Sequence, residues 1–110
     1  MGIVLAPILE GKVDAWKQFT KDFESSGELA DFNQRHGLTR HRAWLAETPA
    51  GTAVIALHEG PGSDEFMMKL ATSDHQGDAK FREFLKDVHG LDFSQPLPGP
   101  LPELMLDSGG

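Results

Sequence analysis

Residues 38–60 read LTRHRAWLAETPAGTAVIALHEG, and this stretch decides the fold. At its centre, Thr48-Pro49-Ala50-Gly51 places proline second and glycine fourth, which is the preferred chemistry of a type I turn. The flanking segments are therefore predicted to be two antiparallel strands joined by this turn.

Taking these four residues as the loop fixes how the two strands pair. Glu47 then faces Thr52, and His41 lies directly opposite His58. One face of the hairpin carries His41, Ala43, Leu45, Val54, Ala56 and His58, and the other carries Arg40, Arg42, Trp44, Ala53, Ile55, Leu57 and Glu59. Because neither face is fully polar, we expect a sheet that is covered on both sides.

Apolar spacing predicts the remaining elements. A strand is expected over residues 2–9, helices over residues 13–36 (with a break near 25–27), 66–70 and 81–88, and a last strand over residues 103–107. A proline-rich arm, residues 91–102, leads to that strand. The order corresponds to an α+β, ferredoxin-like βαββ(α)αβ domain over residues 1–110, with a four-stranded antiparallel sheet.

Composition narrows the functional classes. The 110 residues carry 10 Lys and Arg against 17 Asp and Glu, so the net charge of -7 disfavours nucleic acid and anionic membranes as partners. The absence of cysteine excludes disulfides and thiolate chemistry, and a cytoplasmic location is expected. The apolar start follows no basic region, and no stretch approaches the ~20 apolar residues that span a bilayer, so no membrane anchor is expected.

Two segments carry a resemblance to a known family: GLTRHRAWLAETPAG (residues 37–51) and FREFLKDVHGLDFSQPLPGPLPELMLDS (residues 81–108). They resemble small bacterial proteins without assigned activity in the dimeric α/β-barrel superfamily. Two ferredoxin-like subunits of that superfamily pack their open sheet faces around a central cavity. The resemblance therefore implies a homodimer with one pocket per subunit, in a superfamily that includes cofactor-independent monooxygenases, muconolactone isomerase-like enzymes and haem-binding enzymes. None of its catalytic motifs maps onto this chain.

The histidine pair is the first candidate site. His41 and His58 would face each other where Ala43 and Ala56 leave space, so two imidazoles that titrate near neutrality would line a cavity. They are the expected proton-handling, catalytic residues, and hydrogen bonding between two structural histidines is the alternative. No third ligand is evident, so neither a metal site nor a cofactor is predicted.

Arg42 and Trp44 are the candidates on the opposite face of the hairpin. Arg42 has no obvious partner and could hold an anionic ligand group, while Trp44 could form a pocket wall. They can serve a ligand only if that face lines the pocket, and the sequence does not decide between the two faces.

The favoured function is binding of a small, apolar or aromatic metabolite, with cofactor-independent monooxygenase, isomerase or cyclase chemistry as an open extension. The alternatives are a non-catalytic homodimeric interaction protein and a haem-binding enzyme, for which His75 or His89 would be the helical ligand. An empty cavity that reaches His41 or His58 would favour the ligand hypothesis over the interaction hypothesis.

Overall fold

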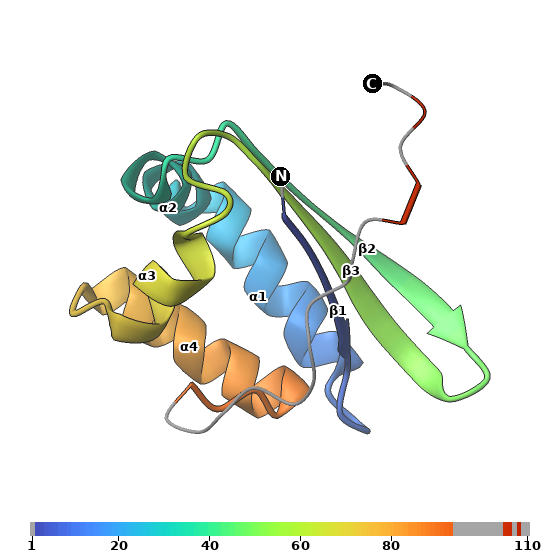
Figure 1. The fold of residues 1–110 in the computed structure, drawn as a ribbon. Coiled ribbons are helices and arrows are strands. Elements are labelled where there is room, and N and C mark those ends of the chain that lie inside the picture. Colours follow the sequence, from blue (N-terminus) through green and yellow to red (C-terminus); the bar gives the residue numbers. More distant parts are fainter. Residues whose placement is uncertain (1, 94–104, 107, 109–110) are drawn as a thin grey trace.

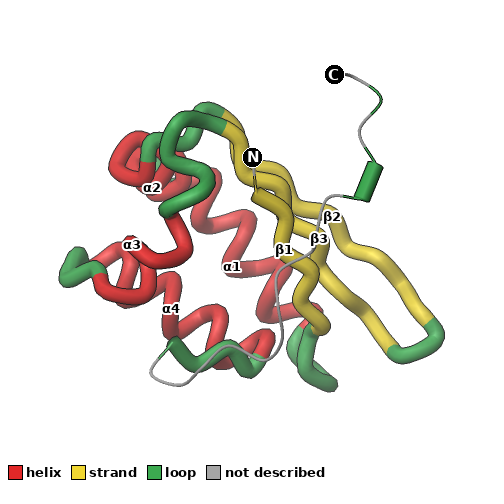
Figure 2. Tube along the Cα trace, in the orientation of Figure 1, coloured by secondary structure: helices red, strands yellow, loops and turns green. Residues whose placement is uncertain are grey.

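The computed structural model describes residues 2–93, 105, 106 and 108 as two layers, a sheet and a set of helices. In chain order the elements are β1 (Gly2–Pro7), α1 (Val13–Ser25), α2 (Glu28–His36), β2 (Arg40–Thr48), β3 (Gly51–Glu59), α3 (Phe66–Thr72) and α4 (Gln76–His89). The strands form an antiparallel sheet in the order β1-β3-β2. All four helices lie on one face of this sheet (Figures 1 and 2).

The predicted hairpin register is confirmed. His41 pairs with His58, and Glu47 pairs with Thr52. The ladder continues one pair further than predicted, to Thr48 and Gly51, so the loop itself contains only two residues. The Thr48 hydroxyl donates a hydrogen bond of 2.7 Å to the Gly51 carbonyl oxygen and thereby closes the turn.

The prediction of a four-stranded, ferredoxin-like sheet is wrong, because the described residues form a sheet of three strands. Met105 and Leu106 belong to no strand, and 81% and 87% of their surfaces are exposed. The rest of the predicted last strand, and residues 94–102 of the proline-rich arm, lie outside the described residues. A short apolar run flanked by charge shows only that a segment can be extended, and a strand also needs a neighbouring edge to pair with. The expected dimeric α/β barrel requires this four-stranded sheet, so that prediction is wrong as well.

Glycines mark both ends of α2. Gly27 separates α1 from α2 with a φ of 85°, and Gly37 ends α2 with a φ of 66°. Both values lie in the left-handed region, which glycine adopts without steric cost, so the predicted break in the long first helix is confirmed. The last helix begins earlier than its apolar residues suggested, because the His75 ring accepts a hydrogen bond from the Gly77 backbone N–H and caps α4.

A close backbone contact fixes the loop after β3 against the end of α2. The Gly62 N–H donates a 2.9 Å hydrogen bond to the Gly37 carbonyl oxygen. A Cβ atom on Gly62 would collide with the carbonyl of His36, so this position accepts no side chain. The contact positions the start of α3 beside the core, whose buried members are Phe23, Phe32, Leu38, Phe66 and Leu70.

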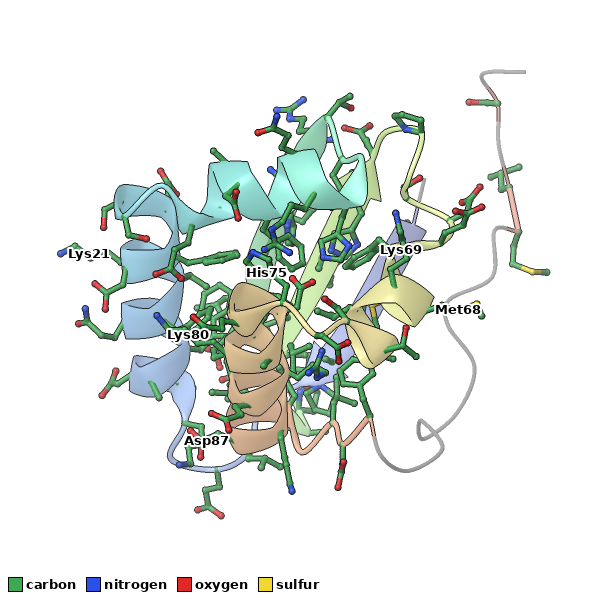
Figure 3. All side chains as sticks on the ribbon, turned by 90° about the vertical axis from the view of Figure 1, so that its left-hand side faces the viewer. Lys21, Met68, Lys69, His75, Lys80 and Asp87 are labelled. Carbon is green, nitrogen blue, oxygen red and sulfur yellow. The ribbon has the colours of Figure 1, made fainter. Side chains whose placement is uncertain are left out.

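The sheet face turned away from the helices is apolar and partly exposed. Ile3, Leu5, Trp44 and Ile55 leave 40%, 59%, 46% and 37% of their surfaces accessible. The outer surface of the helical layer is charged instead, with exposed side chains such as Lys21, Lys80 and Asp87 (Figure 3). Among the described helices, none has the length and apolar character needed to cross a bilayer.

Candidate ligand cavity

A cavity of about 300 Å³ separates the sheet from the helices. Its walls are largely apolar and aromatic, and the rings that line it are Trp16, Phe19, Phe23, Phe66, Phe81 and Phe84. Apart from His41 and His58, the sheet contributes small side chains, namely those of Val4, Ala6, Ala43, Val54 and Ala56. The cavity exists because these short side chains do not fill the space below the aromatic layer.

Two of the residues that line the cavity are exposed to solvent. Glu24 on α1 and Ala43 on β2 both line it, and both are exposed. Among the lining residues, the rings of Phe19 and Phe84 stack in parallel with their centroids 3.8 Å apart.

His41 and His58 lie side by side in the wall of this cavity. Their Nε2 atoms are 3.1 Å apart, and the ring centroids are separated by 4.3 Å. His58 is only 3% exposed, and Phe66 packs against its ring with centroids 4.2 Å apart. The predicted cross-strand pairing has thus placed both imidazoles on the helix-covered face.

The pair stays neutral at physiological pH. Burial lowers the pKa of His41 to about 4. Burial, with a further contribution from the charge of His41, lowers the pKa of His58 to about 3, although the Gly2 backbone opposes this shift. Two neutral rings can share only one hydrogen between their Nε2 atoms, so one ring donates and the other accepts.

This arrangement leaves the other nitrogen of each ring without a hydrogen-bond partner in the described part of the chain. The accepting ring must carry its own hydrogen on Nδ1, yet the Nδ1 atoms of His41 and His58 are both buried without a hydrogen-bond partner of good geometry among the described residues. The backbone of Gly2 lies near the His58 ring and is the one group that weakly favours its protonation. A buried polar atom without a partner costs about 1–3 kcal/mol. Both Nδ1 atoms are closed off from the cavity surface, so the Nε2 atoms are the polar groups of the pair that a ligand could engage.

Arg42 and Trp44 lie on the opposite face of the sheet and do not join the histidines. The Arg42 guanidinium is 3.5 Å from the Glu59 carboxylate and lies over the Trp44 ring, 5.4 Å from its centroid. Neither residue lines the cavity. The cavity therefore lies against the face of the hairpin that carries the histidines.

The sequence did not predict a buried polar cluster between α2 and α4. Asp78, only 1% exposed, accepts hydrogen bonds from Arg35 Nη1 at 2.9 Å and from His36 Nε2 at 3.0 Å. Burial alone would raise the pKa of Asp78, but polar contacts with Ser73, His36 and Arg35 outweigh it and lower this pKa to about 2. The cluster joins α2 to α4, and 42 residues separate His36 from Asp78, so no local pattern could have revealed it.

The cavity also contains His89, which the sequence suggested only as a haem ligand. Its Nδ1 lies 2.9 Å from the Pro7 carbonyl oxygen. The other haem candidate, His75, is exposed and caps α4 through its ring. Among the residues that the structure describes, no group of three or more His, Asp or Glu side chains is placed to hold a metal ion.

No protein-family model, curated protein or solved structure matches this chain.

Proposed function

We propose that the protein binds a small, largely apolar organic molecule in the cavity between the sheet and the helices. The observation that carries this proposal is an apolar space of about 300 Å³ with two facing histidines in its wall. Ligand pockets range from roughly 300 to 1,000 Å³ and combine apolar walls with a few polar groups, which is the composition found here.

Hydrogen bonding is the role we assign to His41 and His58. A general base works best when its pKa lies near the operating pH, and the pKa values of about 4 and 3 are well below neutrality. The neutral pair is better suited to orient a ligand hydroxyl group that inserts between the two Nε2 atoms, where it accepts a hydrogen bond from one ring and donates one to the other. Cofactor-independent acid–base catalysis would require a bound ligand that raises these pKa values, for example by presenting an oxyanion to the rings.

The test compares 1-naphthol with naphthalene, which has the same rings without the hydroxyl group, by titration calorimetry. We expect 1-naphthol to bind about fivefold more tightly than naphthalene, the ratio for about one net hydrogen bond. His58→Phe should remove this difference while naphthalene still binds. Equal binding of both compounds to the unmodified protein would contradict the role of the histidine pair.

A matched pair of substitutions tests the cavity itself. Ala56→Leu places a larger side chain in the cavity, whereas Ala46→Leu makes the same change on a strand position outside it. We expect Ala56→Leu to abolish binding of both naphthalene and 1-naphthol, and Ala46→Leu to preserve it. If neither compound binds the unmodified protein, or if Ala56→Leu has no effect on their binding, the proposal fails.

We also propose that the protein forms a weak homodimer through its outer sheet face. This face exposes Leu5, Trp44 and Ile55, and a second copy would present the same apolar patch. Three strands at about 4.8 Å spacing and up to nine residues long cover roughly 400 Å² per copy, below the roughly 800 Å² of a standard interface. We therefore expect a dissociation constant on the order of 100 μM.

Analytical ultracentrifugation over a concentration series tests this dimer. Leu5→Glu places a charge in the patch, and Leu9→Glu is the control, since Leu9 is also exposed but lies after the strand. We expect self-association that Leu5→Glu abolishes and Leu9→Glu preserves. A protein that stays monomeric at millimolar concentration contradicts the dimer without affecting the ligand proposal.

A further inference from the structure

Short side chains cross the sheet in rows and form one wall of the cavity. In the strand register Ala56 of β3 pairs with Val4 of β1 and with Ala43 of β2, so these three residues make one row. In the neighbouring row Ala6 of β1 pairs with Val54 of β3. All five residues line the cavity, and we call them its floor. Because their side chains are alanine and valine, the floor is a low, broad surface of methyl groups.

Aromatic rings from the helices line the cavity opposite the floor. Phe19 comes from α1, and Phe81 and Phe84 come from α4. Aromatic rings attract one another in offset-stacked and in edge-to-face contacts, so a flat aromatic ligand gains from them whichever way they turn. A saturated ring makes no contact of this kind. The two walls together therefore favour a flat ligand that is aromatic.

The volume of the cavity suits a ligand of two fused rings. An apolar cavity of about 150 Å³ holds benzene. The cavity of this protein, at about 300 Å³, has roughly twice that volume. Its floor is also wide enough, because the two rows lie about 7 Å apart along the strands and the strands lie about 4.8 Å apart.

The lining offers nothing to balance a negative charge on a ligand. Among the described residues, no lysine or arginine contributes to it, and its one ionised side chain, Glu24, is itself negative. Burial lowers the pKa values of His41 and His58, which keeps both rings neutral. An ionised acid group would therefore lose its hydration in the cavity without gaining a counter-charge, which disfavours acidic ligands.

We propose that the ligand is a planar aromatic compound of about two fused rings without an acidic group, and that it lies on the floor with the phenylalanine rings above it. This inference rests on the proposed ligand-binding function and specifies the class of ligand. It requires no hydrogen bond from the histidine pair.

Three alcohols with the same number of carbon atoms test this class by titration calorimetry. Naphthalene-1-methanol, its decahydro analogue and 1-adamantanemethanol carry one hydroxymethyl group on a planar, a puckered and a globular hydrocarbon. The two saturated compounds are more hydrophobic, so transfer from water alone would favour them. We expect naphthalene-1-methanol to bind about fivefold more tightly than either, the ratio for about 1 kcal/mol of aromatic contact. Naphthalene-1-carboxylate should show no binding.

A matched pair of substitutions tests the contribution of the rings. Phe84→Leu keeps an apolar side chain in the cavity but removes its aromatic ring, so the preference for naphthalene-1-methanol over its decahydro analogue should fall at least twofold. Phe93→Leu makes the same change at a residue that packs against the core without lining the cavity, and it should preserve the preference.

The unmodified protein provides an independent test of where the ligand lies. A flat aromatic ring on the floor should shift the methyl proton signals of Ala43 and Ala56 upfield through its ring current when naphthalene-1-methanol saturates the protein. The methyl signal of Ala46 should not move, because successive side chains of a strand point to opposite faces and Ala46 does not line the cavity.

The outcomes separate this inference from the proposed function. If a saturated alcohol binds as tightly as naphthalene-1-methanol, if naphthalene-1-carboxylate binds equally well, or if the Ala43 and Ala56 signals do not shift, the planar aromatic ligand is refuted and the ligand-binding cavity stands. If none of the three alcohols binds and naphthalene does not bind either, the proposed function is refuted, and this inference is refuted with it.

Discussion

Acidification from pH 7 to pH 5 should destabilise the protein through His41 and His58. Each ring has a pKa near 6.5 when unfolded, and the folded protein lowers these values to about 4 and about 3. Between these limits the unfolded chain binds more protons than the folded one, so the free energy of unfolding falls as the pH falls. The stabilisation is complete above pH 6.5 and is lost progressively as the pH decreases toward the folded values.

The magnitude follows from the same values. Between pH 7 and pH 5 each histidine alone would lower the free energy of unfolding by about 2 kcal/mol. The two rings share a hydrogen bond and titrate as a pair, so we expect a joint loss of about 2–4 kcal/mol. For a domain of this size the total stability is about 5–15 kcal/mol, so the loss is easily measured.

Urea unfolding at both pH values provides the assay. The unmodified protein is compared with the double variant His41→Gln/His58→Gln, in which neither position can titrate. Other groups, including the buried His89, change protonation equally in both proteins and cancel in the difference. A double variant that loses as much stability as the unmodified protein would refute the reasoning, as would imidazole ring signals of His41 and His58 that titrate near pH 6.5 by NMR.

Two further predictions concern packing and buried charge, and both are read from urea unfolding. Gly62→Ala should lower the free energy of unfolding by about 3 kcal/mol or more, because the new Cβ atom collides with backbone. Gly27→Ala has open space around it and should lose only the roughly 1–2 kcal/mol that a left-handed conformation costs. Similar losses in the two variants would contradict the close contact at Gly62. Asp78→Asn should lower the free energy of unfolding by about 3 kcal/mol, because it removes the negative charge that the buried hydrogen-bond donors face. Asp87→Asn, in an exposed ion pair on the same helix, should lower it by less than about 1 kcal/mol. Equal effects of the two Asp→Asn changes would show that the buried cluster does not stabilise the fold.

Local chemistry made the hairpin predictable. A single turn sequence fixed the register, and the register placed His41 opposite His58 beside Ala43 and Ala56. The same pattern could not tell which face of the hairpin the helices cover, because both faces carry apolar residues. The packing of the helices on one face of the sheet determines which side chains line the cavity. Arg42 lies on the other face and therefore does not line it.

Long-range contacts set the limit of prediction. Asp78 reads as an ordinary acidic residue in the first turn of a helix, and only the fold brings it to His36. His89 became a cavity residue because its ring bonds to Pro7, 82 positions away in the chain. The wrongly expected fourth strand has the same cause, since a strand is defined by its partner and the apolar pattern at residues 103–107 specified none.

The position of β2 at the border of the sheet has a consequence for aggregation. Within the described residues β2 is an edge strand, so one row of its backbone amides and carbonyls is left to pair with any extended chain that approaches. Charges at Arg40 and Arg42 on one side and at Glu47 on the other bracket the uncharged residues 43–46. We expect these three charges to oppose pairing between copies of the protein, so neutralising them should favour edge-to-edge assembly into fibrils.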